Sequence, residues 1–198
     1  MNGLICGLDE AGRGALAGPL VAAAVVLPQG WRLEDADPGV PVRDSKKLSI
    51  RHRDRLFEII EQYAQKIEIE IISVEEINEH GINWANKEAF RRLIFRIDAA
   101  EYIIDGNFHL PNLGKKATLV RSLIRADETI PSVMSAGIVA KVKRDMIMQA
   151  LHLQYPHYGW NTNTGHGTQK HIDALRKYGL CVHHRSQFAA TALRKSFR

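Results

Sequence analysis

The amino-acid sequence predicts an α/β protein built on a mixed β-sheet. Two short apolar runs, residues 4–8 and 19–27, flank a glycine-rich turn and indicate the two strands of a hairpin. Beyond a loop at 28–42, strand-like and helix-like segments alternate, which is typical of a sheet covered by helices. The chain has 198 residues, 45% hydrophobic and 25% charged, which suits one globular domain.

The segments after this loop are assigned from their apolar spacing and capping residues. Ser49 is a suitable N-cap for a helix at 51–64, and the alternating residues 67–74 predict a half-buried strand. A short helix is expected at 75–80. Asn83 is expected to cap a longer helix, because the apolar residues that follow it fall on one helical face.

The second half of the chain continues the same alternation. A short buried strand at 102–104 precedes an Asp-Gly-Asn turn, and residues 117–124 are compatible with another strand. A long helix is expected at 131–153, with a proline near its first turn. A turn-rich stretch follows, then a helix at 168–178 that a glycine terminates. For the last residues, 191–198, the sequence predicts no element.

The charge and cysteine content narrow the class of protein. The net charge is +5 and the pI is about 9.3, and several clusters of basic residues favour a polyanionic partner. Cys6 and Cys181 have no metal-like spacing, which fits a reducing compartment. No apolar stretch approaches the ~20 residues that span a bilayer. We therefore expect a cytoplasmic protein with no membrane partner.

Acidic residues fall at or just beyond the ends of predicted strands. Asp9 and Glu10 follow the first strand, Asp105 follows the strand at 102–104, and Asp127 comes after a further apolar segment. Taken alone, Asp105 is more typical of a turn than of a metal site, and Asp127 is more typical of a helix cap. If the strands are neighbours, the carboxylates converge and repel one another unless a cation is present. Oxygen ligands favour Mg²⁺ or Mn²⁺, and two such ions can hydrolyse a phosphodiester.

Several motifs along nearly the whole chain resemble bacterial ribonuclease HII, a type 2 ribonuclease H. GLDEAGRG and DSKKLS, in this order and at this spacing, carry most of the resemblance. The full set is GLDEAGRG (7–14), DSKKLS (44–49), GIN (81–83), IDGN (104–107), AKVKRD (140–145), YPHYG (155–159), NTGHGT (163–168) and HR (184–185).

The resemblance implies a ribonuclease H-like fold, a five-stranded mixed sheet flanked by helices. It implies one catalytic domain over residues 1–198, with a C-terminal helical extension from about 155 that contributes to substrate binding. It also implies a monomeric endonuclease that cuts the RNA strand of RNA–DNA hybrids and the 5′ side of single ribonucleotides in duplex DNA. The products would carry 5′-phosphate and 3′-hydroxyl ends, and two Mn²⁺ or Mg²⁺ ions would assist.

Carried onto this chain, the resemblance assigns the catalytic and metal-binding roles to four carboxylates. It also assigns recognition of the ribose 2′-hydroxyl, which distinguishes RNA from DNA, to backbone groups of a Gly-Arg-Gly turn. The carboxylates are Asp9, Glu10, Asp105 and Asp127, and the turn is Gly12, Arg13 and Gly14.

Phosphate contacts that position a duplex without reading its sequence follow from the same resemblance. Lys46, Lys47 and Lys141 are expected to make them, with help from Asn83. The Arg144–Asp145 dipeptide is open to two interpretations, a further substrate contact or an internal structural pair.

The sequence departs from the family pattern mainly at His166, where a tyrosine is usual. The family tyrosine stacks on a sugar beside the ribonucleotide junction, and a histidine offers a smaller ring that titrates near pH 6–7. The segment 134–137 reads Met-Ser-Ala-Gly where a serine-rich run is usual, and Ala126 replaces a common glycine. None of these changes affects the four carboxylates.

Other classes fit the sequence less well. A junction resolvase would share clustered acids but has no need of the Gly-Arg-Gly turn or DSKKLS. A binding module without catalysis would not need four carboxylates, and a nucleotide-binding protein would need a phosphate loop that this chain lacks. A zinc site at His166 and His171, or at His183 and His184, is disfavoured because no cysteine accompanies either pair.

Overall fold

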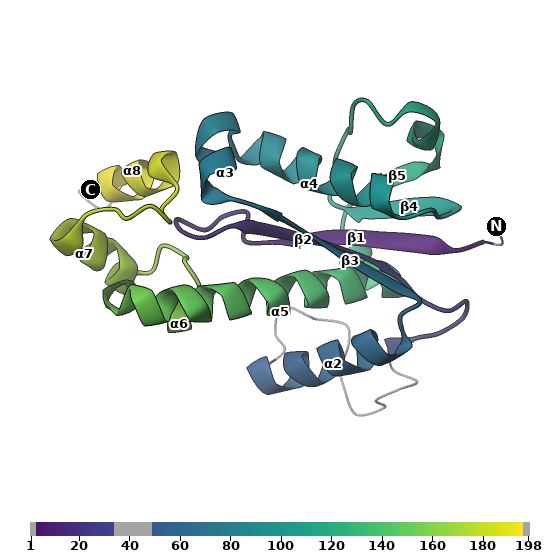
Figure 1. Ribbon diagram of the computed structural model, residues 1–198, viewed down its shortest axis with the longest axis horizontal. Helices are drawn as coiled ribbons and strands as arrows, with labels where there is room; N and C mark the ends of the chain where they lie inside the picture. The colour runs from purple at the N-terminus through teal and green to yellow at the C-terminus, as the bar shows by residue number, and fades with distance from the viewer. Residues whose placement is uncertain (1–2, 34–48, 196–198) are drawn as a thin grey trace.

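The computed structural model describes residues 3–33 and 49–195. A five-stranded mixed sheet with strand order β3-β2-β1-β4-β5 forms its centre (Figure 1). β2 pairs antiparallel with β1 and β3, whereas β4 is parallel to β1 and β5. This arrangement confirms the fold class predicted from the sequence. The strands are β1 (Ile5–Ala11), β2 (Leu20–Val26), β3 (Lys66–Ile72), β4 (Glu101–Asp105) and β5 (Val120–Leu123).

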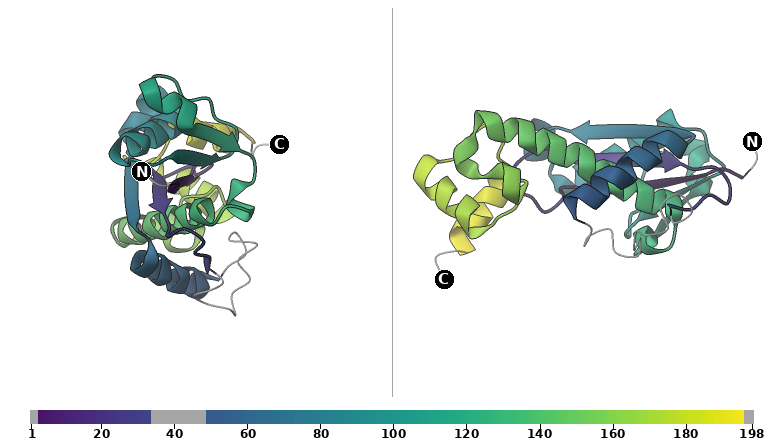
Figure 2. Two further views of the ribbon diagram at one scale, coloured as in Figure 1. Left: turned by 90° about the vertical axis from the view of Figure 1, so that its right-hand side faces the viewer. Right: turned by 90° about the horizontal axis from the view of Figure 1, so that it is seen from below.

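Helices cover both faces of the sheet, with α4 on one face and α5 and α2 on the other (Figures 1 and 2). Each face has its own apolar core: Leu8 and Phe90 belong to the core under α4, and Val21 and Val139 to the core under α5. The helices are α2 (Ile50–Tyr63), α3 (Val74–His80), α4 (Ile82–Arg96), α5 (Pro131–Gln154), α6 (Trp160–Asn163), α7 (Gln169–Tyr178) and α8 (Ser186–Lys195), and the 3₁₀ turns are η2 (Gly114–Leu119), η3 (Ala126–Glu128) and η4 (Pro156–Tyr158).

Close packing of α5 on β1 depends on a glycine. A Cβ atom at Gly7 would lie 2.2 Å from backbone atoms of Ser132 and Val133. Such a contact cannot be relieved by moving a flexible side chain, because both neighbours are main chain. The glycine therefore sets how near α5 comes to the central strand, and with it the position of every α5 side chain that faces β1.

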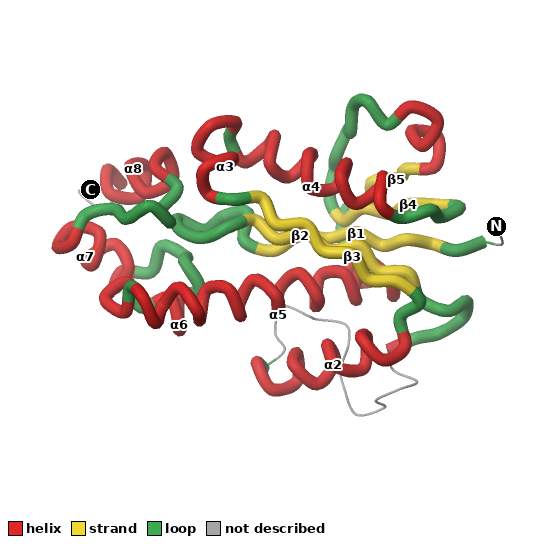
Figure 3. Tube along the Cα trace, in the orientation of Figure 1, coloured by secondary structure: helices red, strands yellow, loops and turns green. Residues whose placement is uncertain are grey.

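The last three helices gather at the end of the molecule away from the N-terminus (Figures 2 and 3). A third apolar core, which includes Leu16, Met148, Tyr158, Trp160 and Leu175, joins them to the end of α5 and to the segment after β1. The structure agrees with the predicted helix α7. It adds α6 and α8, which lie within the helical extension that the resemblance implied but which the apolar pattern did not predict as separate helices. α8 also includes residues 191–195 of the tail for which no element was predicted.

Three local expectations were wrong. β1 continues through Asp9 and Glu10 to Ala11, because antiparallel pairing with β2 extends to that residue. Asn83 lies inside α4, whose N-cap is Gly81. In the segment 117–124 only Val120–Leu123 is strand, and η2 precedes it. The second part of the loop expected at 28–42 lies outside the described residues.

Within residues 3–33 and 49–195, every helix is too short or too polar to cross a bilayer.

Candidate active site

Three aspartates from separate segments meet at one edge of the sheet. Asp9 lies in β1, Asp105 is the last residue of the parallel neighbour β4, and Asp127 lies in η3 just after β5. One carboxylate oxygen from each lies within 4.8 Å of the others. Parallel strands end at the same edge of a sheet, so the topology brings together residues that are 96 and 22 positions apart.

Local contacts fix two of these side chains. The Asp105 carboxylate accepts a hydrogen bond of 2.8 Å from the Ala126 backbone N–H, which ties η3 to the end of β4. Asp9 Oδ1 accepts one of 2.7 Å from the N–H of Glu10. On the α5 side, a Cβ atom at Gly137 would lie 2.4 Å from Asp9 Oδ2. The absence of a side chain at Gly137 therefore leaves room for the Asp9 carboxylate.

Glu10 is not one of the three clustered acids. Successive side chains of a strand point to opposite faces, so Asp9 faces α5 while Glu10 turns toward α4. Burial, with a smaller contribution from the charge of Asp105, raises the pKa of Glu10 to about 7 against the lowering effects of Arg13 and of the Asn86 amide. Glu10 still lines the same pocket as Asp9 and Asp127, so it is adjacent to the cluster.

The electrostatics of the cluster suit a divalent cation. Burial raises the pKa of Asp9 well above its usual value, and the charges of Glu10, Asp105 and Asp127 raise it further. A buried group of acids with converging oxygens is stabilised by a hard cation that neutralises the repulsion. The donors present therefore fit Mg²⁺ or Mn²⁺, and the cluster of Asp9, Asp105 and Asp127 is a metal-binding candidate.

We expect the metal-free protein to be destabilised by Glu10 at high pH. Its folded pKa of about 7 lies above the unfolded value of 4.5. The folded state therefore holds this proton more tightly, and the contribution to stability is lost as the pH rises through 7. In urea unfolding with EDTA, Glu10→Gln should match the wild type at pH 4 and exceed it by up to about 3 kcal/mol at pH 8. Parallel pH profiles for the two proteins would contradict this expectation.

A pocket of about 220 Å³ opens beside the cluster. Lys141 and Arg53 line it, and both contact Asp145: Lys141 Nζ lies 2.6 Å from Asp145 Oδ1, and Arg53 Nη1 lies 3.4 Å from Oδ2. His166 closes another side of the pocket. Burial, followed by the charges of Arg144, Lys141 and Arg185, lowers the pKa of His166. The imidazole is therefore neutral at pH 7, and the titration expected near pH 6–7 shifts to lower pH.

The Gly-Arg-Gly turn borders this pocket. Gly12 lines it, and Arg13 Nη2 donates a hydrogen bond of 3.3 Å to Asn83 Oδ1. The Arg13 guanidinium also lies over the Phe108 ring, 5.5 Å from its centroid. Gly14 has open space beside its Cα. The structure thus brings Asn83 to the turn, whereas Lys46 and Lys47 lie outside the described residues.

The histidines of the C-terminal region form a hydrogen-bonded network instead of a metal centre. His171 Nε2 lies 3.2 Å from Trp160 Nε1 and 3.1 Å from His184 Nε2. Its Nδ1 lies 2.9 Å from the carbonyl of His166. In the part of the chain that the structure describes, only the three aspartates form a cluster of potential metal ligands.

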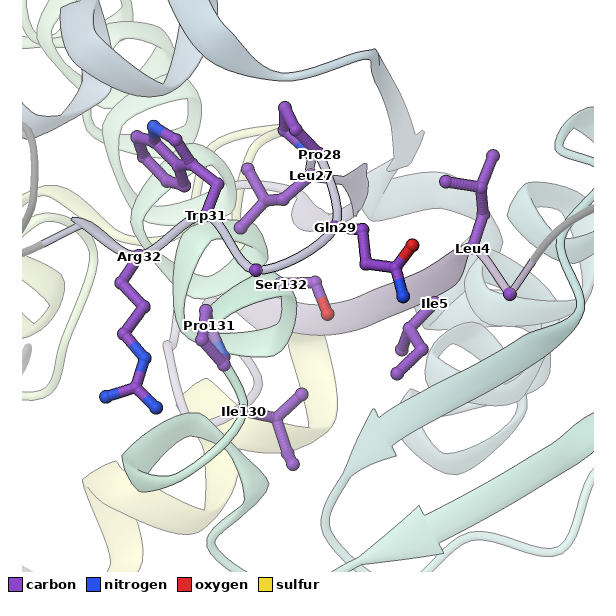
Figure 4. A pocket seen from close by; sticks show the side chains of 12 residues that line it. Leu4, Ile5, Leu27, Pro28, Gln29, Trp31, Arg32, Ile130, Pro131 and Ser132 are labelled. Atoms are coloured by element: carbon purple, nitrogen blue, oxygen red, sulfur yellow. The ribbon is translucent and has the colours of Figure 1, made fainter.

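A second pocket, of about 190 Å³, lies away from the acids near the start of β1 (Figure 4). Its walls are mostly apolar, and it has no carboxylate among its lining residues. It therefore lacks the groups that the chemistry of a hydrolase requires. Its lining includes Leu4, Ile5, Leu27, Pro28, Trp31 and Ile130.

Some residues of the site could not be found from the sequence. Asn86 is fully buried, and neither atom of its amide has a hydrogen-bond partner among the described residues, although the amide influences Glu10. Gly137 leaves space for Asp9. Arg144 does not pair with Asp145; it donates hydrogen bonds to three backbone carbonyls instead. The resemblance marked Gly137 only as a departure from the family pattern.

Comparisons with known proteins agree with this geometry. The sequence profile of the family described as Ribonuclease HII matches residues 6–191. Ribonuclease HII of Burkholderia mallei (strain SAVP1) is 42% identical over 188 residues, which cover 94% of this chain and 83% of that protein.

Solved structures show the same architecture. The Archaeoglobus fulgidus PCNA:RNase HII complex contains a chain that matches with a TM-score of 0.77 and 28% identity, over 92% of this chain and 93% of that one. Bst-RNase HIII in complex with Mn²⁺ matches with a TM-score of 0.73 and 19% identity, over 98% of this chain and 70% of that one.

The five-stranded mixed sheet and the clustered aspartates define a nuclease of the ribonuclease H-like fold, a hydrolase. Within that class, the match over nearly the whole chain is decisive. The chain belongs to the ribonuclease HII family.

Proposed function

We propose that this enzyme cuts the RNA strand of RNA–DNA hybrids and the 5′ side of single ribonucleotides in duplex DNA, leaving 5′-phosphate and 3′-hydroxyl ends. The observation that carries the proposal is the placement of three converging aspartates beside the Gly12–Gly14 turn. Such a site can bind the scissile phosphate next to backbone groups of the turn that contact the adjacent ribose. Ribonucleotide removal from DNA and removal of RNA primers are the cellular roles that this reaction would serve.

The carboxylates Asp9, Asp105 and Asp127, with Glu10 adjacent, are the proposed catalytic and metal-binding residues. Two Mn²⁺ or Mg²⁺ ions held there would polarise the phosphodiester and activate water. The chain's own contribution is to hold the acids in place: β1 and β4 fix Asp9 and Asp105, and the hydrogen bond from Ala126 fixes the turn that carries Asp127.

Substrate binding is assigned to the surfaces around that pocket. Backbone groups of Gly12, Arg13 and Gly14 are proposed to contact the ribose, and Lys141 to contact phosphate from the pocket wall. Further proposed contacts are Asn83 and His166 in the described structure and Lys46 and Lys47 outside it. The family resemblance also supports one catalytic domain with a substrate-binding extension, acting as a monomer in the cytoplasm.

His166→Tyr is expected to shift substrate preference toward single ribonucleotides. Tyrosine offers a larger ring for stacking on a sugar, which we expect to raise the ratio of junction cleavage to long-hybrid cleavage about three- to tenfold. Initial rates on both substrates for the two proteins would measure this ratio. Since the imidazole is already neutral at pH 7, the ratio should vary little between pH 7 and 9. An unchanged ratio would show that His166 does not contact the junction.

The proposal is tested with an end-labelled DNA duplex that contains one ribonucleotide. An all-DNA duplex and a long RNA–DNA hybrid serve as companions, each with Mg²⁺, Mn²⁺ or EDTA. Metal-dependent cutting on the 5′ side of the ribonucleotide, with the all-DNA duplex intact, is the expected result. Cutting of the all-DNA duplex at the same rate would refute recognition of the 2′-hydroxyl, and binding without any cutting would refute catalysis.

A further inference from the structure

Two arginines lie fully buried beneath the Gly-Arg-Gly turn. Arg144 comes from α5, and Arg185 immediately precedes α8; the exposed fraction of both side chains is 0%. Neither forms an ion pair with a described residue. A buried charge without a counter-ion is costly unless its donors are satisfied by other groups. Burial and, to a smaller extent, the charge of Arg144 lower the pKa of Arg185 to about 9.

Backbone carbonyls take the place of a counter-ion at two of the three nitrogens of Arg185, whereas its Nη2 has no hydrogen-bond partner among the described residues. Its Nη1 donates to the carbonyls of Gly12 at 2.7 Å and Arg13 at 3.1 Å, and its Nε donates to the carbonyl of Gly18 at 2.9 Å. One planar guanidinium thus bridges both ends of the segment between β1 and β2. Lysine could not reproduce this, because a single ammonium cannot direct donors along a rigid fork.

Arg144 holds the same segment from the other side. Its three nitrogens donate to the carbonyls of Pro19, Ala17 and Thr164 at 2.9–3.0 Å. At Gly12, where φ is +93°, a Cβ atom would lie 1.9 Å from Arg144 Nε. The turn therefore rests on the arginine side chain, and only glycine permits this approach.

The C-terminal extension also holds the segment through its main chain. Leu16 N–H donates to the carbonyl of Gly165 at 2.8 Å, and Gly18 N–H to that of His183 at 2.9 Å. In return, the Arg185 N–H donates to the carbonyl of Leu16 at 2.8 Å. The extension is thus attached to the segment at several points, and Arg185 is the residue that binds the carbonyl of Arg13.

These carbonyl contacts determine where the N–H groups of the turn point. A trans peptide is planar, so its N–H points opposite to its C=O. Arg185 binds the carbonyls of Gly12 and Arg13, which turns the N–H groups of Arg13 and Gly14 away from the protein interior. Neither N–H donates to another described residue, and both residues are exposed. Two adjacent donors are thereby presented next to the acidic pocket.

We propose that Arg185 is a positioning residue for specificity: by holding the carbonyls of Gly12 and Arg13, it aims the N–H groups of Arg13 and Gly14 at the ribose 2′-oxygen. This inference rests on the proposed function and assigns the discrimination between RNA and DNA partly to the C-terminal extension. Arg185 itself lies behind the turn and acts through it, without touching the substrate.

The test compares wild type, Arg185→Lys and the exposed control Arg121→Lys, whose arginine pairs with Glu101 at the far edge of the sheet. For each protein, KM is measured on a DNA duplex with one ribonucleotide, and the inhibition constant Ki on the all-DNA duplex. We expect Arg185→Lys to lower the ratio of Ki to KM about tenfold by raising KM alone, because a contact to the 2′-oxygen is lost. Arg121→Lys should leave the ratio unchanged.

A folded Arg185→Lys protein with a wild-type ratio would overturn the inference alone. A wild type that shows neither cleavage nor preference for the ribonucleotide would overturn the proposed function and the inference with it. If Arg185→Lys does not fold, the inference is tested by measuring the backbone order parameters of Arg13 and Gly14 in the wild-type protein without substrate. Values near 0.85, as in rigid strands, support a prearranged turn, and values below about 0.6 refute it.

Discussion

Asp9→Asn is expected to abolish cleavage while making the metal-free protein more stable. Asp9 is one of the three clustered acids, and burial together with the charges of Glu10, Asp105 and Asp127 raises its pKa. Asparagine keeps the shape and can accept the hydrogen bond from Glu10 N–H, but it removes the charge that a cation would neutralise. Changes to groups that only support metal ligands typically cost 10–100-fold, so loss of a ligand should exceed about 100-fold.

Two measurements separate this expectation from simple misfolding. Cleavage of the ribonucleotide-containing duplex is followed with Mn²⁺, and thermal unfolding is followed with and without the ion. The wild type should gain stability from Mn²⁺ through preferential binding to the folded state, and Asp9→Asn should gain little. Asp98→Asn is the matched control, since Asp98 is 76% exposed and pairs with Lys116. Cleavage by Asp9→Asn within tenfold of wild type would exclude Asp9 as a metal ligand.

The convergence of Asp9, Asp105 and Asp127 could be predicted because it depends on local patterns. Apolar runs locate the strands, and the carboxylates that end or follow them must share an edge if the strands are parallel neighbours. The type of reaction, in contrast, was inferred from the family resemblance. The same reasoning placed Glu10 in one set with Asp9. Adjacent residues of a strand face opposite sides, so Glu10 lines the pocket of Asp9 and Asp127 without being one of the three clustered aspartates. Because β1 extends beyond Leu8, this alternation applies to both acids.

Other features depend on contacts between distant segments and leave no local signal. The N-terminus of α8 is satisfied by Asn78, whose Oδ1 accepts from Ser186 N–H at 2.9 Å across 108 residues. A search for capping residues within the tail cannot find such a partner. Arg144 and Arg185 likewise resemble surface cations in the sequence, yet the turn and the C-terminal helices bury both of them. Burial of this kind follows from the assembled fold alone.

Gly137→Ala is expected to reduce activity strongly with little loss of stability. In the interior of a helix, alanine is usually more stable than glycine by about 0.5–1 kcal/mol. Here the added Cβ would lie 2.4 Å from Asp9 Oδ2 and 3.4 Å from Asp9 Cγ. The atom that must yield is the end of a side chain, so the Asp9 carboxylate rotates away and the backbone keeps its place. We expect Mn²⁺ affinity to fall about 10–100-fold, as for a misoriented ligand, and cleavage to fall with it.

A double-mutant cycle with Asp9→Ala isolates this contact. In the wild-type background, the helix-propensity gain of Gly137→Ala is offset by displacement of the carboxylate, so the free energy of unfolding should change little. In the Asp9→Ala background the obstructing oxygen is gone, and the same substitution should stabilise the protein by its full ~0.5–1 kcal/mol. Urea unfolding of the four proteins in EDTA measures both steps. Equal effects of Gly137→Ala in the two backgrounds, together with wild-type Mn²⁺ affinity, would show that α5 leaves space for Asp9 without needing glycine.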